Sequence, residues 1–151
     1  MVLDHENYMK RAIELALKVP ELPFGAVIVD SQSRTIVSEG WNRTSINPLL
    51  HGEIDAIDRL AESRAVVDWG RLVLYTTAES CPMCQAAALW SGIGMVVYGT
   101  SIPTLQRLGW KQIDLRSEEV VRRSPFAQCI LLGGILEREC DALFEAALRA
   151  G

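Results

Sequence analysis

Long hydrophobic runs, an excess of basic residues and a dense set of cysteines are all missing from this chain of 151 residues. No apolar run approaches the roughly 20 residues that cross a bilayer, and the charged start lacks the regions of a signal peptide. Lysine and arginine number 15 against 19 aspartate and glutamate residues, and this balance disfavours a nucleic-acid partner held by broad phosphate contacts. Four cysteines are too few for a secreted disulfide scaffold. These absences leave a cytoplasmic enzyme or binding protein without membrane contact as the default.

The composition that is present is ordinary for a globular protein, with 49% hydrophobic and 23% charged residues. The length fits a single domain over residues 1–151. The element order predicts an α/β fold of three layers, α/β/α, with a five-stranded mixed sheet. Residues 100–125 are the least legible, with short helices expected over 105–110 and near 117–121. The other expected helices are 6–19, 49–62, 82–90 and 135–150, and the expected strands are 24–29, 36–41, 71–76, 95–98 and 128–132.

Cys81 and Cys84 lie at the turn between an expected strand and the helix that follows it. Taken alone, a Cys-x-x-Cys turn is compatible with a metal site, a redox pair or simple packing. Pro82 at the first helical position places Cys81 at the helix N-cap, where free amides and the helix dipole favour a thiolate. His51 and Glu53 stand at the start of another helix, where an open first turn lets both face one pocket. We therefore expect two helix N-termini to converge at one edge of the sheet.

His51, Cys81 and Cys84 supply three ligands of the kind that Zn²⁺ prefers and leave a fourth tetrahedral position open for water. This is the arrangement of catalytic zinc, whereas a structural site needs a fourth protein ligand. Two thiolates and a neutral imidazole make the zinc site formally neutral, so the metal lowers the pKa of its water less than it would with three histidines. A nearby carboxylate that accepts the proton from water is therefore more important for catalysis. Glu53 suits that role as general base and proton shuttle. The set predicts hydrolytic attack on an electrophilic carbon, and deamination of an amino-heterocycle fits it.

The pattern His51-x-Glu53 with Cys81-Pro-Met-Cys84 resembles the H-x-E and P-C-x-x-C signature of the zinc-dependent cytidine deaminase superfamily. Here the proline follows the first cysteine instead of preceding it, which alters the turn and removes no ligand. The flanking residues are similar to fungal cytosine deaminase in some positions and to bacterial guanine deaminase and tRNA adenosine deaminase in others. The resemblance implies a cytidine deaminase-like fold and assembly as a homodimer.

Three residues are expected to bind the substrate, and the resemblance suggests the first two of them. Phe24, at the start of the first strand, is expected to line the pocket, and Asn42, after the second strand, matches the position that meets a carbonyl of the base. Trp90 is expected at the pocket or at a packing or dimer interface.

The function that follows is zinc-dependent hydrolytic deamination of a free nucleobase, nucleoside or related amino-heterocycle, of cytosine or guanine type, with release of ammonia. One alternative is a tRNA adenosine deaminase, which would share the zinc site. The chain lacks a lysine-rich C-terminal helix, and this disfavours that alternative. A second alternative, of another class, is a catalytically silent, zinc-stabilised binding module. In such a module Glu53 would have no catalytic role.

The remaining candidate residues have structural interpretations. Cys129 and Cys140 are expected in the core, because free cysteine is among the most buried residue types. Asp55 and Asp58 are expected on the solvated face of their helix. Glu79, just before the cysteine turn, is expected to be exposed, and the alternative is that it pairs with an amino group of the substrate.

Overall fold

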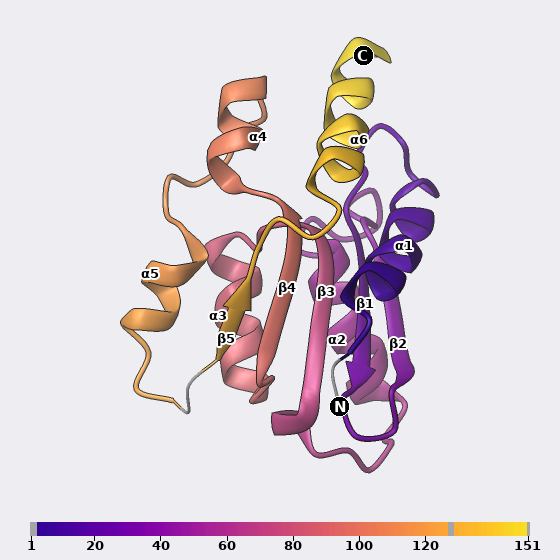
Figure 1. The fold of residues 1–151 in the computed structure, drawn as a ribbon, viewed down its shortest axis with the longest axis vertical. Coiled ribbons are helices and arrows are strands. Elements are labelled where there is room, and N and C mark those ends of the chain that lie inside the picture. The colour runs from indigo at the N-terminus through magenta and orange to yellow at the C-terminus, as the bar shows by residue number, and fades with distance from the viewer. Residues whose placement is uncertain (1–2, 127–128, 151) are drawn as a thin grey trace.

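A five-stranded mixed sheet runs through the middle of the molecule (Figure 1). The computed structural model describes residues 3–126 and 129–150. β1 lies antiparallel to both β2 and β3, while β3, β4 and β5 are parallel to one another, in the spatial order β2-β1-β3-β4-β5. The expected mixed sheet is thereby confirmed, although residue 128, the expected start of the last strand, lies outside the described residues. The strands are β1 (Gly25–Asp30), β2 (Thr35–Trp41), β3 (Leu72–Ala78), β4 (Met95–Thr100) and β5 (Ile130–Leu132).

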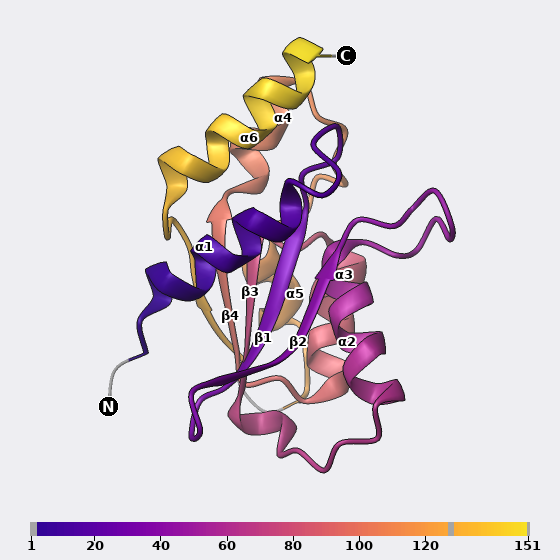
Figure 2. The same cartoon turned by 90° about the vertical axis from the view of Figure 1, so that its right-hand side faces the viewer.

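Helices cover both faces of the sheet, as the three-layer prediction requires (Figure 2). On β3, Leu72 and Leu74 pack toward one face and Val73 and Tyr75 toward the other, which is the period-2 alternation of a strand buried on both sides. One face is covered by α1 (His5–Ala16) and α6 (Glu137–Ala150), and the other by α2 (Gly52–Glu62), α3 (Pro82–Ser91) and α5 (Ser117–Arg122). A short 3-10 helix, η1 (Trp69–Arg71), precedes β3. Across the described part of the chain, no helix is long and apolar enough to span a membrane.

The region that is least legible in the sequence contains two short helices separated by a loop. α4 (Ile102–Leu108) ends at Gly109, whose φ of 104° is left-handed and is readily adopted only by glycine. Trp110 therefore lies in the loop between α4 and α5, not in the helix that was expected to extend to it. The main-chain N–H of Trp110 donates to the carbonyl of Leu105 at 2.9 Å, so the loop folds back against α4.

One edge of the sheet gathers the start of β1 and the ends of β2, β3 and β4. The first turn of α2 approaches this edge closely at Gly52, where a Cβ atom would lie 2.7 Å from the carbonyl oxygen of Phe24. Glycine is required at this contact because any side chain would push the helix away from β1. The contact places His51 and Glu53 beside the start of β1, next to the turn that follows β3.

Candidate active site

The three expected metal ligands meet at two helix N-termini. His51 is the N-cap of α2 and Cys81 the N-cap of α3, each with extended backbone. His51 Nδ1 lies 3.7 Å from Cys81 Sγ and 3.6 Å from Cys84 Sγ, and the three ligand atoms lie within 4.8 Å of one another. Tetrahedral zinc with ordinary Zn–S and Zn–N bonds would separate nitrogen and sulfur ligands by about 3.6 Å. The donor set and its spacing therefore fit Zn²⁺, and the expected convergence of the two helices is confirmed.

The two sulfurs are electrostatically unequal. The Cys84 thiol donates toward Cys81 and, with the help of His51, lowers the pKa of Cys81 to about 4 despite burial. The same interaction with Cys81, together with burial, raises the pKa of Cys84 well above its ordinary value. The interaction with Cys81 also raises the pKa of His51, against the effect of burial. A cation placed among these groups would favour both thiolates and the neutral imidazole, because metal ligands bind in their deprotonated forms.

Glu53 is buried next to these ligands, with only 4% of its surface exposed. Burial and the negative charge of Cys81 raise the pKa of its carboxyl group to about 7, while His51 acts in the opposite direction. A carboxyl group whose pKa lies near neutrality can both accept and donate a proton at physiological pH.

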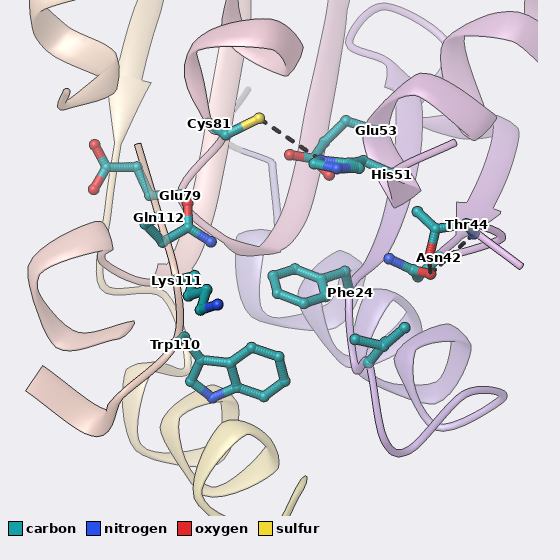
Figure 3. A pocket seen from close by; sticks show the side chains of 11 residues that line it. Phe24, Asn42, Thr44, His51, Glu53, Glu79, Cys81, Trp110, Lys111 and Gln112 are labelled. Carbon is teal, nitrogen blue, oxygen red and sulfur yellow. Dashed lines mark hydrogen bonds between the residues drawn. The ribbon is translucent and has the colours of Figure 1, made fainter. Parts of the chain in front are cut away.

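A cavity of about 240 Å³ opens in front of this cluster (Figure 3). Asn42, after β2, is 8% exposed and its Oδ1 atom accepts hydrogen bonds from the backbone and hydroxyl of Thr44, at 3.1 and 2.8 Å. These bonds orient the side chain so that its amide nitrogen points toward the cavity, where it can donate to an acceptor on a ligand. The lining residues are Leu22, Phe24, Asn42, Thr44, His51, Glu53, Glu79, Cys81, Trp110, Lys111 and Gln112.

Aromatic side chains form the wall of the cavity farthest from the metal ligands. Phe24 meets Trp110 edge to face, with ring centroids 5.6 Å apart, and both rings contact Phe144 of α6. The indole N–H of Trp110 donates to the main-chain carbonyl of Phe144 at 3.2 Å. Phe24 thus belongs to the cavity wall and to a small apolar cluster at once, and α6 supports the wall from behind.

The structure does not bring Trp90 to this cavity. It lies near the C-terminus of α3. At a rise of 1.5 Å per residue, this is about 12 Å along the helix from its first residue, Pro82. Its side chain is 76% exposed and packs against Phe126 on the surface, with ring centroids 4.6 Å apart.

The expectation of exposed positions for Asp55 and Glu79 is wrong. Asp55 is 1% exposed and accepts hydrogen bonds from the backbone of Trp41 and from Arg43 and Arg59, which fastens α2 to the end of β2. Glu79 is 3% exposed and bonded to residues of the 102–117 region. Asp58 is exposed, and Cys129 and Cys140 are buried in the two main cores, all as expected.

Sequence reasoning missed most of the cavity wall. Thr44 carries a local signal, because an asparagine two residues before a threonine favours the Asx turn that orients Asn42. Lys111 and Gln112 have no such local signal in the sequence. They follow a short helix, in a loop whose position depends on contacts with distant residues.

The fold and the site together define a zinc-dependent deaminase. Residues 3–100 match the model of the cytidine and deoxycytidylate deaminase zinc-binding region, and the chain belongs to this family. The family assignment agrees with the donor set at His51, Cys81 and Cys84, which forms a candidate zinc site.

Individual relatives differ in their activities. A guanine deaminase of Bacillus subtilis is 34% identical over 141 residues, which cover 85% of this chain and 88% of that protein. A tRNA-specific adenosine deaminase of the same organism is 31% identical over 95% of this chain and 88% of its own length. The solved structure of a guanine deaminase from Nitrosomonas europaea matches with a TM-score of 0.80 at 21% identity, covering 97% of this chain and 86% of that one, and so supports the fold.

Proposed function

We propose that this deaminase acts on a free nucleobase or a closely related amino-heterocycle, with guanine as the first candidate. One observation carries the proposal: the buried Glu53 faces the same small cavity as the zinc ligands His51 and Cys81. The volume of about 240 Å³ is below the usual range for drug-sized ligands and suits a single ring system. The Bacillus guanine deaminase, aligned over most of both chains, favours guanine among the bases.

In the proposed reaction, water adds to the ring carbon that bears the amino group, the C–N bond breaks, and ammonia leaves. When held by His51, Cys81 and Cys84, Zn²⁺ supplies a Lewis acid that activates water for this attack. Glu53 accepts a proton from water and delivers it to a ring nitrogen. It then carries a second proton, from the hydroxyl group added to the carbon, to the departing amine. Burial raises the pKa of its carboxyl group above the ordinary value, which favours its return of the proton.

The cavity wall would hold the ring in place. The amide nitrogen of Asn42 would donate to a carbonyl oxygen of the base, since its own carbonyl is already engaged by Thr44. Phe24 and Trp110 would contact the ring with their apolar surfaces.

The test is ammonia release from guanine, cytosine, adenine and their nucleosides, with Glu53→Gln as the diagnostic variant. We expect turnover of at least one base and a loss of about 10²- to 10⁴-fold in kcat for Glu53→Gln, with zinc content unchanged. Asp58→Asn, an exposed change on the same helix, is the matched control and should behave like the unmodified chain. Zinc content without deamination of any base would instead support the binding module.

The tRNA-specific adenosine deaminases among the relatives make tRNA a second candidate substrate. The alignment with the Bacillus tRNA-specific adenosine deaminase covers at least as much of both chains as the alignment with the guanine deaminase. The net charge of -4 opposes it, because tRNA binding depends on neutralising phosphates. Inosine formation in tRNA, together with a gel shift at moderate salt, would establish this activity in place of base deamination.

A homodimer through the surface around Trp90 is a separate part of the proposal. Trp90 and Phe126 lie side by side over α3 and α5 and are 76% and 41% exposed. Exposed aromatic pairs of this kind are enriched at protein interfaces. Sedimentation equilibrium should show a dimer that Trp90→Glu dissociates, while Val66→Glu, an isolated exposed position, leaves it intact. A monomeric unmodified chain would contradict this part alone.

A further inference from the structure

Glu79 links the metal-ligand turn to the opposite wall of the cavity. It lies two residues before Cys81, yet its side chain is 1% exposed and bonds to residues far along the chain. Its carboxylate accepts hydrogen bonds from the backbone N–H of Ile102 at 2.9 Å and from that of Ser117 at 2.9 Å. The Ser117 hydroxyl donates to it at 2.7 Å, and Arg116 Nε lies 3.0 and 3.1 Å from its two oxygens.

Ile102 is the first residue of α4 and Ser117 is the first residue of α5. A single carboxylate therefore satisfies a free N–H at the start of each helix, a group that has no partner within the helix itself. The chain between these anchors contains the wall residues Trp110, Lys111 and Gln112. Both ends of the region that carries the wall are thus held by Glu79, which itself precedes the metal ligands.

The same contacts argue against a role for Glu79 in proton transfer. Ile102 and Arg116 occupy Oε1, while Ser117 contributes two donors to Oε2, which Arg116 also reaches. A carboxylate has about four acceptor sites, so this one has little capacity left for a substrate. Figure 3 agrees, since the carboxylate of Glu79 points away from the cavity while its stem lies at the rim.

We propose that Glu79 is a positioning residue that sets the distance between the zinc ligands and the substrate-binding wall around Trp110, Lys111 and Gln112. The inference rests on the proposed deamination of a base in this cavity. It assigns to Glu79 an effect on substrate binding and on the choice between bases, and none on the chemical step.

The test is Glu79→Gln, which keeps the shape of the side chain and replaces one acceptor oxygen by a donor facing other donors. We expect KM for the best base to rise about tenfold, with kcat within about twofold and zinc content unchanged. The reason is that the charged hydrogen bonds lost are those that hold the wall region, while the zinc ligands keep their own contacts. The ratio of kcat/KM between two bases should also change. A second readout, independent of turnover, is faster amide hydrogen exchange in residues 103–116, with residues 82–91 unaffected.

Glu119→Gln is the matched control, because Glu119 also lies on α5 but pairs with Arg122 and Arg123 near the surface. It should leave KM and exchange unchanged. Ser117→Ala removes one hydroxyl bond from the same carboxylate and should give a smaller shift in the same direction, which keeps the test informative if Glu79→Gln fails to fold. Unchanged KM and unchanged exchange in both variants would overturn the inference, as would a loss of kcat or zinc at constant KM. An unmodified chain that deaminates no base would count against the proposed function, and the exchange measurement would still decide the role of Glu79.

Discussion

The cavity has two halves that are built in different ways. The metal half, with His51, Cys81 and Cys84, is formed by the first turns of two helices packed on the same face of the sheet. The wall half, with Trp110 and its neighbours, belongs to an irregular loop that contacts α6. Glu79 holds the two ends of the longer region, α4 to the start of α5, that contains this loop. The side chains of the metal half are placed by the first turns of regular helices packed on the sheet, whereas those of the wall half lie in a loop whose position depends on contacts with other parts of the chain.

This difference suggests a division of labour. Groups that carry the chemistry lie on elements whose own capping geometry orients them, so changes there should affect kcat or zinc. The proposed substrate contacts at Trp110, Lys111 and Gln112 lie on a loop that can shift without moving the metal ligands, so changes there should affect KM and the choice of base. Variants that change kcat or KM separately would show that the two halves act independently.

The largest effect is expected from Cys84→Ala in the metal half. The loss of a direct ligand should abolish stoichiometric zinc and reduce turnover by more than about 10²-fold, since even residues that only support ligands cost 10- to 100-fold. Zinc per chain by atomic absorption and ammonia release check this. Cys129→Ala removes a buried thiol from the core outside the site, and it should retain both zinc and activity. A Cys84→Ala protein with full zinc and turnover would show that the metal is held elsewhere.

The metal half and most of the fold could be predicted from sequence because their signals are local. Alternating or continuous apolar runs identify the strands, and Pro82 marks the start of α3 within one residue. His51, Glu53 and the two cysteines have the types and spacing that zinc chemistry needs. Sequence patterns could therefore place the ligands before any contact between α2 and α3 was known.

The wall half could not be predicted, because its contacts join distant residues. One error there was local: Gly109 ends α4 before Trp110, whereas the helix predicted from the spacing of Leu105 and Leu108 extends past this glycine. From the sequence, Glu79 is a carboxylate in a turn, a position that is usually exposed. Its burial is explained only by its hydrogen-bond partners, which lie 23 to 38 residues later in the chain. The helical pattern predicted that Asp55 would be exposed to solvent. In the structure its carboxylate is buried and accepts hydrogen bonds from Arg43, Arg59 and the backbone of Trp41, and the pattern does not reveal these partners.

A smaller effect is expected from Trp110→Phe in the wall half. Phenylalanine keeps a ring against Phe24 but loses the hydrogen bond from the indole N–H to Phe144 and part of the cavity surface. We expect KM to rise about three- to tenfold, in keeping with 1 kcal/mol or so for one hydrogen bond, with kcat and zinc unchanged. Steady-state kinetics on the best base check this, with Trp90→Phe as the remote control. A large fall in kcat with unchanged KM would break the separation between the two halves.

The smallest effect is expected outside both halves, at the pair of Arg11 on α1 and Glu39 on β2. The hydrogen bonds from Arg11 hold the pKa of Glu39 below its ordinary value, against the opposing effect of burial. A lowered pKa in the folded state stabilises the fold at pH values above the unfolded pKa of about 4.3, and this contribution is lost as the pH falls through the folded value. Because the side chains are 38% and 32% exposed, Glu39→Gln should lower the free energy of unfolding at pH 7 by less than about 1 kcal/mol.

The difference in unfolding free energy between Glu39→Gln and the unmodified chain should shrink below about pH 4, because the carboxylate of the unmodified chain is then increasingly protonated in both states. Urea unfolding at pH 7 and at low pH measures it. The variant should retain unchanged kcat, KM and zinc content, since Arg11 and Glu39 do not line the cavity. A shift in KM would mean that the wall responds to the general stability of the fold, and KM changes at Trp110 and Glu79 would then no longer identify residues that position the substrate.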